Sequence, residues 1–284
     1  MTGSVPSVTH ATAAGISYWR REGSGRCLVC LHGIGSNAGS FLPMLGHLPA
    51  DWDVIAWNAP GYGASAPLAK DWPVEADYAA ALLGFLDALG LERVTLLGHS
   101  LGTLMAARFA ADHSGRVDSL LLGACAAGHG VAPGSPLSEA TAARLVELDT
   151  LGARAFAEKR APRLVAQPEA RPEALARVTD AMAAVTMPGY GQAVRMLASG
   201  RLADSLRAVT VPVHIVWGTG DVVTPRAQSE RAAEALGGLD IIEVPETGHA
   251  LHVETPAEFS AALLACLNGK PAVPRPHNKK ETLA

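Results

Sequence analysis

One serine in this chain stands where it could act as a nucleophile. Ser100 lies in the pattern Gly98-x-Ser100-x-Gly102, after an apolar run over residues 93–97 and before a helical pattern over 101–111. The two glycines allow a tight strand-to-helix turn, which would lift the hydroxyl above the edge of a sheet. The helix that follows would point its free amides at a substrate carbonyl. We therefore predict Ser100 as a nucleophile.

A serine hydroxyl needs a base whose pKa lies near neutrality, which favours histidine. Of the ten histidines, His249 has a suitable setting, since it follows Gly248 in a loop after a strand-like run, and His252 is a weaker rival. A histidine base needs a carboxylate to hold its tautomer. Asp221 follows a glycine-rich turn at the end of another strand-like run and is our choice, the alternative being a turn or helix-capping aspartate.

An oxyanion formed at Ser100 would need two backbone N–H donors. We expect these from Leu101, directly after the nucleophile, and from Ile34, which follows His32-Gly33 after another strand. His32 and Gly33 are therefore expected beside the substrate. His99 is expected near the substrate pocket too, mainly as a packing residue.

We expect neither a metal ion nor a cofactor. Cys27-x-x-Cys30 lies inside an apolar strand-like run, where residues three apart face opposite sides, and no second cysteine pair completes a zinc site. The sequence holds no H-E-x-x-H pair, and the predicted site offers only His249 and Asp221 as good ligands. The cysteines are expected to be buried thiols.

The positions of these residues follow from an alternation of strands and helices. Strands are expected over residues 16–21 (an edge strand), 27–31, 53–57, 93–97, 117–122, 211–217 and 240–244, and helices over 74–89, 101–111, 225–236 and 256–267. This alternation predicts an α/β fold with a doubly wound, mostly parallel sheet. His32, Ser100, Asp221 and His249 all follow predicted strands, so we expect them at one edge of the sheet.

Residues 128–207 differ from the rest, because strand-like runs give way to short helical patterns broken by prolines. We interpret this segment as a helical insertion into a core formed by 1–127 and 208–268, followed by a disordered tail over 269–284. Three methionines of the insertion are expected to line an apolar substrate pocket or to pack in its own core; they are Met182, Met187 and Met196. Its arginines could bind a substrate carboxylate or form a solvated face; they include Arg144, Arg154, Arg163, Arg171, Arg177 and Arg195.

Composition narrows the classes of partner. The 284 residues are 49% hydrophobic and carry a formal net charge of −4, which gives no reason to expect nucleic acid or an anionic membrane. No run of 18 apolar residues and no secretory signal pattern is present, so we expect a cytoplasmic protein. The expected partner is a small-molecule substrate, and the sequence favours neither a monomer nor a homo-oligomer.

Four of these motifs together resemble the landmarks of the α/β-hydrolase superfamily, in the same order and across about residues 15 to 268. They are His32-Gly33-Ile34-Gly35, Gly98-His99-Ser100-Leu101-Gly102, Gly218-Thr219-Gly220-Asp221 and Gly248-His249. The insertion before Asp221 is similar to the cap of that superfamily. Serine at position 100, where dehalogenases and epoxide hydrolases carry aspartate, implies a serine hydrolase with a catalytic triad of Ser100, Asp221 and His249.

Within the superfamily the chain looks like the small bacterial carboxylesterases, enol-lactonases and meta-cleavage carbon–carbon hydrolases. Carbon–carbon hydrolases commonly follow the catalytic histidine with tryptophan and carry a glycine–proline–glycine oxyanion loop, whereas this chain has Ala250 and Gly33-Ile34-Gly35. The resemblance therefore favours hydrolysis of a small carboxylic ester or a lactone. The alternatives are carbon–carbon cleavage of a vinylogous 1,5-diketone and, more remotely, a non-catalytic ligand-binding protein of the same fold.

Overall fold

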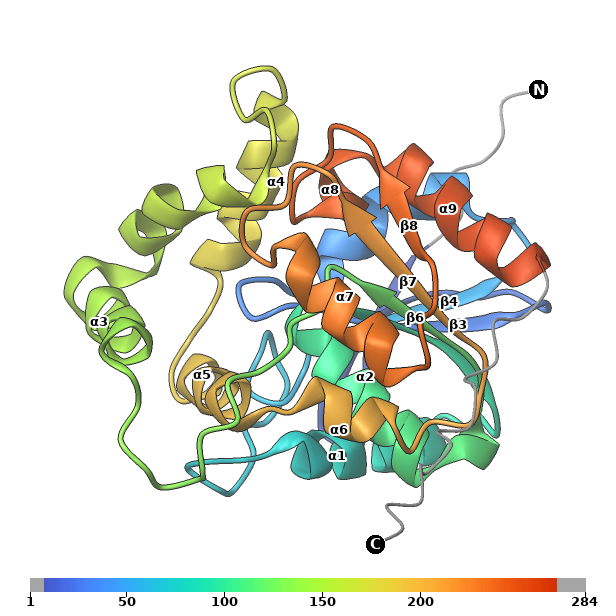
Figure 1. Ribbon diagram of the computed structural model, residues 1–284, viewed down its shortest axis with the longest axis horizontal. Coiled ribbons are helices and arrows are strands. Elements are labelled where there is room, and N and C mark those ends of the chain that lie inside the picture. The colour runs from blue at the N-terminus through green and yellow to red at the C-terminus, as the bar shows by residue number, and fades with distance from the viewer. Residues whose placement is uncertain (1–7, 270–284) are drawn as a thin grey trace, which may run out of the picture.

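The fold is built on one sheet of eight strands, seen in a computed structural model that describes residues 8–269 (Figure 1). The strands are β1 (Thr9–Ala13), β2 (Ile16–Arg21), β3 (Cys27–Leu31), β4 (Asp53–Trp57), β5 (Val94–His99), β6 (Val117–Gly123), β7 (Val213–Gly218) and β8 (Ile241–Val244). Their order is β1-β2-β4-β3-β5-β6-β7-β8, parallel from β4 to β8. The predicted fold class is confirmed. The tail predicted as disordered lies, from residue 270 on, outside the described residues.

The prediction that residues 16–21 form an edge strand is wrong. β2 pairs antiparallel with β4 on one side and with β1 on the other, so β1 is the edge. The hairpin between β1 and β2 turns at Ala14 and Gly15, both with positive φ. β1 has the sequence Thr-His-Ala-Thr-Ala and is largely exposed, so it carries little of the apolar signal by which buried strands are found.

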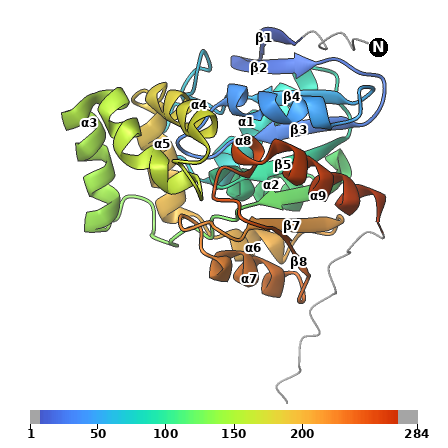
Figure 2. The same cartoon turned by 90° about the horizontal axis from the view of Figure 1, so that it is seen from above.

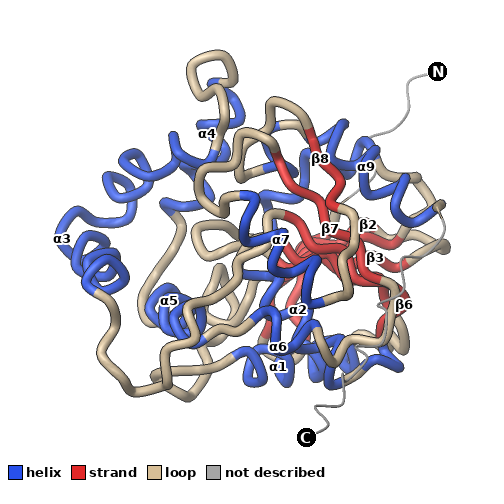
Figure 3. Tube along the Cα trace, viewed as in Figure 1, coloured by secondary structure: helices blue, strands red, loops and turns tan. Residues whose placement is uncertain are grey.

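Helices cover both faces of the sheet (Figure 3). The α-helices are α1 (Glu75–Ala88), α2 (Leu101–Asp112), α3 (Glu139–Arg160), α4 (Pro172–Ala183), α5 (Gly189–Ser199), α6 (Leu202–Leu206), α7 (Arg226–Ala235), α8 (Leu251–Glu254) and α9 (Pro256–Asn268). The 3₁₀ helices are η1 (Ala38–His47), η2 (Ser114–Arg116) and η3 (Ala161–Leu164). Contacts join α1, α2, α6 and α7 into one layer and η1, α8 and α9 into the other.

The two cores follow from the alternation of side chains along the strands. In β3, Val29 and Leu31 belong to the core beneath α1 and α2, whereas Leu28 and Cys30 belong to the core beneath η1 and α9. Cys27 packs on the Val29 side and is half-buried, so Cys27 and Cys30 lie on opposite faces, as expected of strand residues three apart.

Residues 128–207, here called the cap segment, contain α3, η3, α4, α5 and α6. Figure 2 shows α3, α4 and α5 grouped at one side of the sheet. α6 instead packs against α2 and α7, within the core layer. The cap segment is also tied to the core by hydrogen bonds, such as that from Ala250 N to Leu164 O at 2.9 Å. None of the helices within residues 8–269 is long and apolar enough to cross a bilayer.

Candidate active site

Ser100 occupies the sharp turn between β5 and α2. Its backbone is strained, with φ 52° and ψ −118°, and its amide donates to Gly123 O at 2.9 Å. A Cβ at Gly98 would lie 2.5 Å from Gly102 O, and a Cβ at Gly102 would lie 2.1 Å from Leu31 O. Glycine is therefore required at both positions of the motif, because any side chain would collide with the nearby backbone.

His249 and Asp221 form a buried pair behind this turn. His249 Nδ1 lies 2.9 Å from Asp221 Oδ2, and both residues are almost fully buried. Because a carboxylate accepts, Nδ1 carries the proton and donates it, which leaves Nε2 unprotonated and available as a base. Asp221 follows β7 and His249 follows β8, two neighbouring parallel strands, so the carboxyl ends of the strands bring the pair together.

Asp221 is held as an anion by four donors. Its Oδ1 accepts from Val223 N and Thr224 N, and its Oδ2 accepts from Thr224 Oγ1 at 2.7 Å as well as from His249. Burial pushes the pKa of Asp221 upward, but the neighbouring His249 and the bonds from Thr224 outweigh it and lower the pKa below its ordinary value. Sequence reasoning missed Thr224, although an aspartate followed three residues later by threonine is a recognisable turn pattern.

The loop after β3 brings Ile34 toward Ser100. A Cβ at Gly33 would lie 2.9 Å from the Ser100 Cβ, so only glycine allows this approach. Tyr62 Oη donates to Ile34 O at 2.7 Å and fixes the loop, a contact that the sequence did not reveal. The Ile34 amide donates to no acceptor within residues 8–269. Leu101 is the first residue of α2, so its amide has no hydrogen-bond acceptor within the helix. Both amides are free to bind an oxyanion.

His32 and His99 are buried supports with opposite tautomers. Ala59 N donates to His32 Nε2 at 3.0 Å, so the His32 proton sits on Nδ1, which donates to Gly33 O. His99 Nε2 donates to His249 O at 2.7 Å and so holds the loop of the candidate base. Burial lowers the pKa of His32 to about 4, and burial together with His249 lowers the pKa of His99 to about 3.

His252, the rival base, is buried in the interior. Its Nε2 bonds Ser40 Oγ at 3.0 Å and its ring stacks on Phe41, beneath η1. Burial, with smaller effects of the nearby histidines, lowers its pKa well below the ordinary value. His252 therefore lacks both the location and the basicity for the role.

A cavity of about 290 Å³ opens above Ser100 between the core loops and the cap segment. Its walls are Gly33, Ile34, Gly35, Ser36, His99, Ser100, Leu101, Ala126, Gly128, His129, Arg144, Arg160, Arg163, Leu164, Met182, Leu197, Val223, Thr224, Gln228 and His249. Ser100 and His249 face the same cavity, with no hydrogen bond between their side chains in the described part of the chain. Free enzymes often close this bond only around substrate. Residues 8–269 hold no cluster of three or more metal-binding side chains.

Three residues predicted for the pocket lie elsewhere. His32 is beneath the oxyanion loop rather than in the cavity wall. Met196 is fully buried in the hydrophobic core, and Met187 is 56% exposed. Met182 alone of the three methionines lines the cavity, where its Cε would lie 2.8 Å from a Cβ at Gly35. The spacing of the methionines in the sequence could not show which of them faces the cavity.

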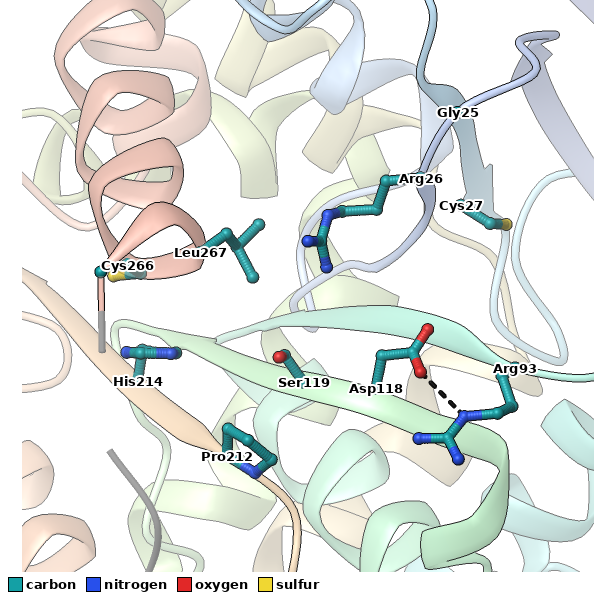
Figure 4. A pocket seen from close by; sticks show the side chains of 11 residues that line it. Gly25, Arg26, Cys27, Arg93, Asp118, Ser119, Pro212, His214, Cys266 and Leu267 are labelled. Atoms are coloured by element: carbon teal, nitrogen blue, oxygen red, sulfur yellow. Dashed lines mark hydrogen bonds and ion pairs between the residues drawn. The ribbon is translucent and has the colours of Figure 1, made fainter. Parts of the chain in front are cut away.

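A second hollow, of about 660 Å³, lies at the opposite edge of the sheet and contains none of the predicted site residues. Figure 4 shows its side chains, which include Arg26, the ion pair of Arg93 with Asp118, and His214. They come from the amino ends of the strands, whereas sites of parallel sheets form at the carboxyl ends.

The sequence is similar to those of known proteins. A family model described as "Alpha/beta hydrolase family" matches residues 28–262. "Putative carbamate hydrolase RutD" of Variovorax paradoxus is 31% identical over 247 residues, which cover 84% of this chain and 91% of that protein.

Two solved structures are similar in fold. The enol-lactonase from Burkholderia xenovorans LB400 superposes with a TM-score of 0.80 at 24% identity, covering 92% of this chain and 100% of that one. An esterase from Thermogutta terrifontis gives a TM-score of 0.78 at 22% identity, covering 92% and 98%. The resemblance inferred from the motifs is confirmed: the chain belongs to the alpha/beta hydrolase family and is a hydrolase of that fold.

Proposed function

We propose that the protein hydrolyses a small carboxylic ester or lactone through an acyl-enzyme on Ser100. The proposal is carried by one observation: a serine held in a strained turn faces the same cavity as a histidine whose Nδ1 is bound to a buried carboxylate. An activated nucleophile of this kind needs such a base and such an orienting group. No metal ion or cofactor is needed for this chemistry.

In the first half of the reaction His249 Nε2 takes the proton from Ser100 Oγ as that oxygen attacks the substrate carbonyl carbon. The carbonyl oxygen becomes an oxyanion and accepts from the amides of Ile34 and Leu101. His249 then gives the proton to the leaving alkoxide oxygen, and the carbon–oxygen bond breaks. From a lactone, the hydroxyl so formed stays joined to the acyl group.

In the second half, water attacks the acyl carbon while His249 accepts its proton. Return of that proton to Ser100 Oγ releases the carboxylic acid and restores the enzyme. Asp221 stays ionised throughout and stabilises the imidazolium, in keeping with its lowered pKa.

An ester or lactone is preferred because the solved structures similar in fold include an enol-lactonase and an esterase. The relative named as a carbamate hydrolase adds carbamates to the substrates worth testing. The discriminating comparison is 4-nitrophenyl butyrate against a vinylogous 1,5-diketone. Faster turnover of the diketone would favour carbon–carbon hydrolysis, and saturable binding without turnover of any of these compounds would favour a ligand-binding protein.

The direct test is labelling with an alkylphosphonate ester. Mass spectrometry should find one adduct, on Ser100, and Ser100→Ala should lower kcat by about 10⁴- to 10⁶-fold. Ser119→Ala is the matched control, since Ser119 lies at the opposite edge of the sheet. A phosphonate on another serine, or near-normal turnover by Ser100→Ala, would overturn the mechanism.

A further inference from the structure

We propose that this cavity selects substrates that carry a carboxylate besides the bond to be cleaved, and that Arg144 binds that carboxylate. The inference rests on the proposed function, since it names the class of ester or lactone taken by the same site. It starts from the charge of the walls: three arginines line the cavity, namely Arg144, Arg160 and Arg163, and no aspartate or glutamate does.

Two of the three arginines have other surroundings. Arg160 donates from Nε to Glu147 Oε2 at 2.6 Å, and its guanidinium lies 4.9 Å from the centre of the Phe156 ring. It is thus paired within the cap segment, with a carboxylate that Lys159 also contacts. Arg163, in η3, is exposed, so water solvates it at the rim. Neither is an unbalanced charge inside the cavity.

Arg144 is different. It extends from α3, is half-buried, and forms no ion pair with any residue that the structure describes. Its one hydrogen bond runs from Nη2 to Tyr190 Oη at 3.2 Å, while its Nε is fully buried without a partner. A buried guanidinium nitrogen without a hydrogen-bond partner, on an arginine without a carboxylate, is costly. A ligand carboxylate bound through the terminal nitrogens of Arg144 would supply the missing countercharge.

The chemistry of the group fits an anion of that shape. A guanidinium presents a planar fork of N–H donors, which matches the two oxygens of a carboxylate. Arg144 also lies close enough to Tyr62 to counter part of the rise in the Tyr62 pKa, a rise due first to burial. Since Tyr62 holds Ile34 O, the arginine is close to the oxyanion loop.

The size of the cavity limits the substrate. About 290 Å³ is at the low end for ligand sites, which run from roughly 300 to 1,000 Å³. One small molecule must therefore place its reacting carbonyl at Ser100 and its carboxylate at Arg144. Monoesters of short dicarboxylic acids and lactones with a short carboxylate side chain meet this requirement.

The experiment compares matched esters on the full-length protein. Monomethyl adipate and dimethyl adipate share the reacting ester and differ in whether the far end is an anion. The wild type should show a higher kcat/KM for the monoester. Arg144→Met should lower the monoester-to-diester ratio by roughly 10- to 100-fold, mostly through KM, and Arg144→Lys should restore part of it.

Arg154→Met is the matched control, because Arg154 lies in α3 beyond its kink at Gly152, pairs with Asp180 and is outside the cavity. It should keep the wild-type ratio. A ratio that is unchanged in Arg144→Met, or that is lost in Arg163→Met instead, would overturn the assignment. Melting temperatures of all variants exclude misfolding as the cause.

A binding measurement distinguishes failure of the proposed function from failure of the carboxylate site. If the wild type cleaves neither ester, binding of adipate is measured by calorimetry with the wild type, Arg144→Met and Arg154→Met. Binding lost in Arg144→Met alone would support the carboxylate site without ester hydrolysis. Equal binding by all three, or none by the wild type, would overturn it.

Discussion

The two walls of the cavity above Ser100 are built differently. On the core side, the wall consists of short loops after β3, β5, β7 and β8, and Asp221 there is fixed by four hydrogen-bond donors. On the cap side, the wall consists of long side chains, such as Arg144 and Met182, with few fixed partners. Under the proposed function, we infer from this difference that the core wall carries out the reaction and the cap wall selects the substrate.

One buried carboxylate joins the two walls. Glu254 accepts from Gly248 N at 2.7 Å and from Ala166 N at 2.9 Å, and it pairs with Arg171 of the cap segment. Its side chain is fully buried. The loop that carries His249 and the cap segment over residues 164–171 are therefore fixed to a common anchor.

The largest expected effect is the loss of kcat on substitution of Asp221, in the core wall. Asp221→Asn keeps the shape but presents an amide to His249 Nδ1, which favours the wrong tautomer and leaves the imidazolium unstabilised. We expect kcat to fall by about 10⁴-fold. Steady-state kinetics measures this, with Asp240→Asn, exposed just before β8, as control. A loss of less than tenfold in Asp221→Asn would refute the assigned role.

The next effect concerns the buried histidines of the core wall. His32 and His99 have pKa values near 4 and 3 when folded, below the ordinary value of about 6.5 that they regain on unfolding. Between pH 6.5 and 4 the unfolded chain binds more protons, so stability is full above pH 6.5 and falls on acidification. At pH 5 each histidine should cost about 2 kcal/mol.

Urea unfolding at pH 7.5 and pH 5 measures this loss. His99→Gln can keep the bond to His249 O, because its amide nitrogen takes the place of Nε2. The variant should lose only about half as much stability between pH 7.5 and pH 5 as the two histidines cost together. His10→Gln, with an exposed histidine on β1, is the control. The same pH dependence in His99→Gln as in the wild type would contradict the explanation.

A smaller effect is expected from separating the two walls. Glu254→Gln removes the charge that Arg171 and two backbone amides share, and we expect the free energy of unfolding to fall by about 3 kcal/mol. Chemical denaturation measures it. Glu173→Gln, exposed on α4, should change stability by less than about 0.5 kcal/mol. Equal stabilities of the two variants would show that Glu254 is no anchor.

The smallest effect concerns selectivity at the cap wall. Met182→Ala enlarges the cavity and should shift the relative kcat/KM for acetate, butyrate and hexanoate esters by roughly tenfold toward longer chains. Met187→Ala, at an exposed position, is the matched control and should leave the ranking as it is. Met196→Ala should lower stability instead, since Met196 is buried in the core. If the chain-length ranking shifted in Met187→Ala but not in Met182→Ala, the assignment of Met182 to the cavity wall would be wrong.

The sequence alone predicted the sheet and the order of its main elements, because buried parallel strands are nearly continuous apolar runs and therefore stand out. It also placed Ser100, Asp221 and His249 directly after strands, and the carboxyl ends of parallel strands necessarily meet at one edge. Elements without such a signal were missed: β1 is polar and exposed, and η1 and α8 are short or irregular.

The contacts between segments distant in sequence were decided only by the tertiary structure. Apolar spacing gave the same expectation for Met182, Met187 and Met196, yet the packing of the helices sends one to the cavity, one to solvent and one to the core. Likewise, the sequence did not distinguish the six arginines named for the cap segment, and only the fold shows that Arg144 lines the cavity, half-buried and without a carboxylate partner. The physical reason is that periodicity records which side of an element is apolar, whereas the partner of that side is set by how the elements pack.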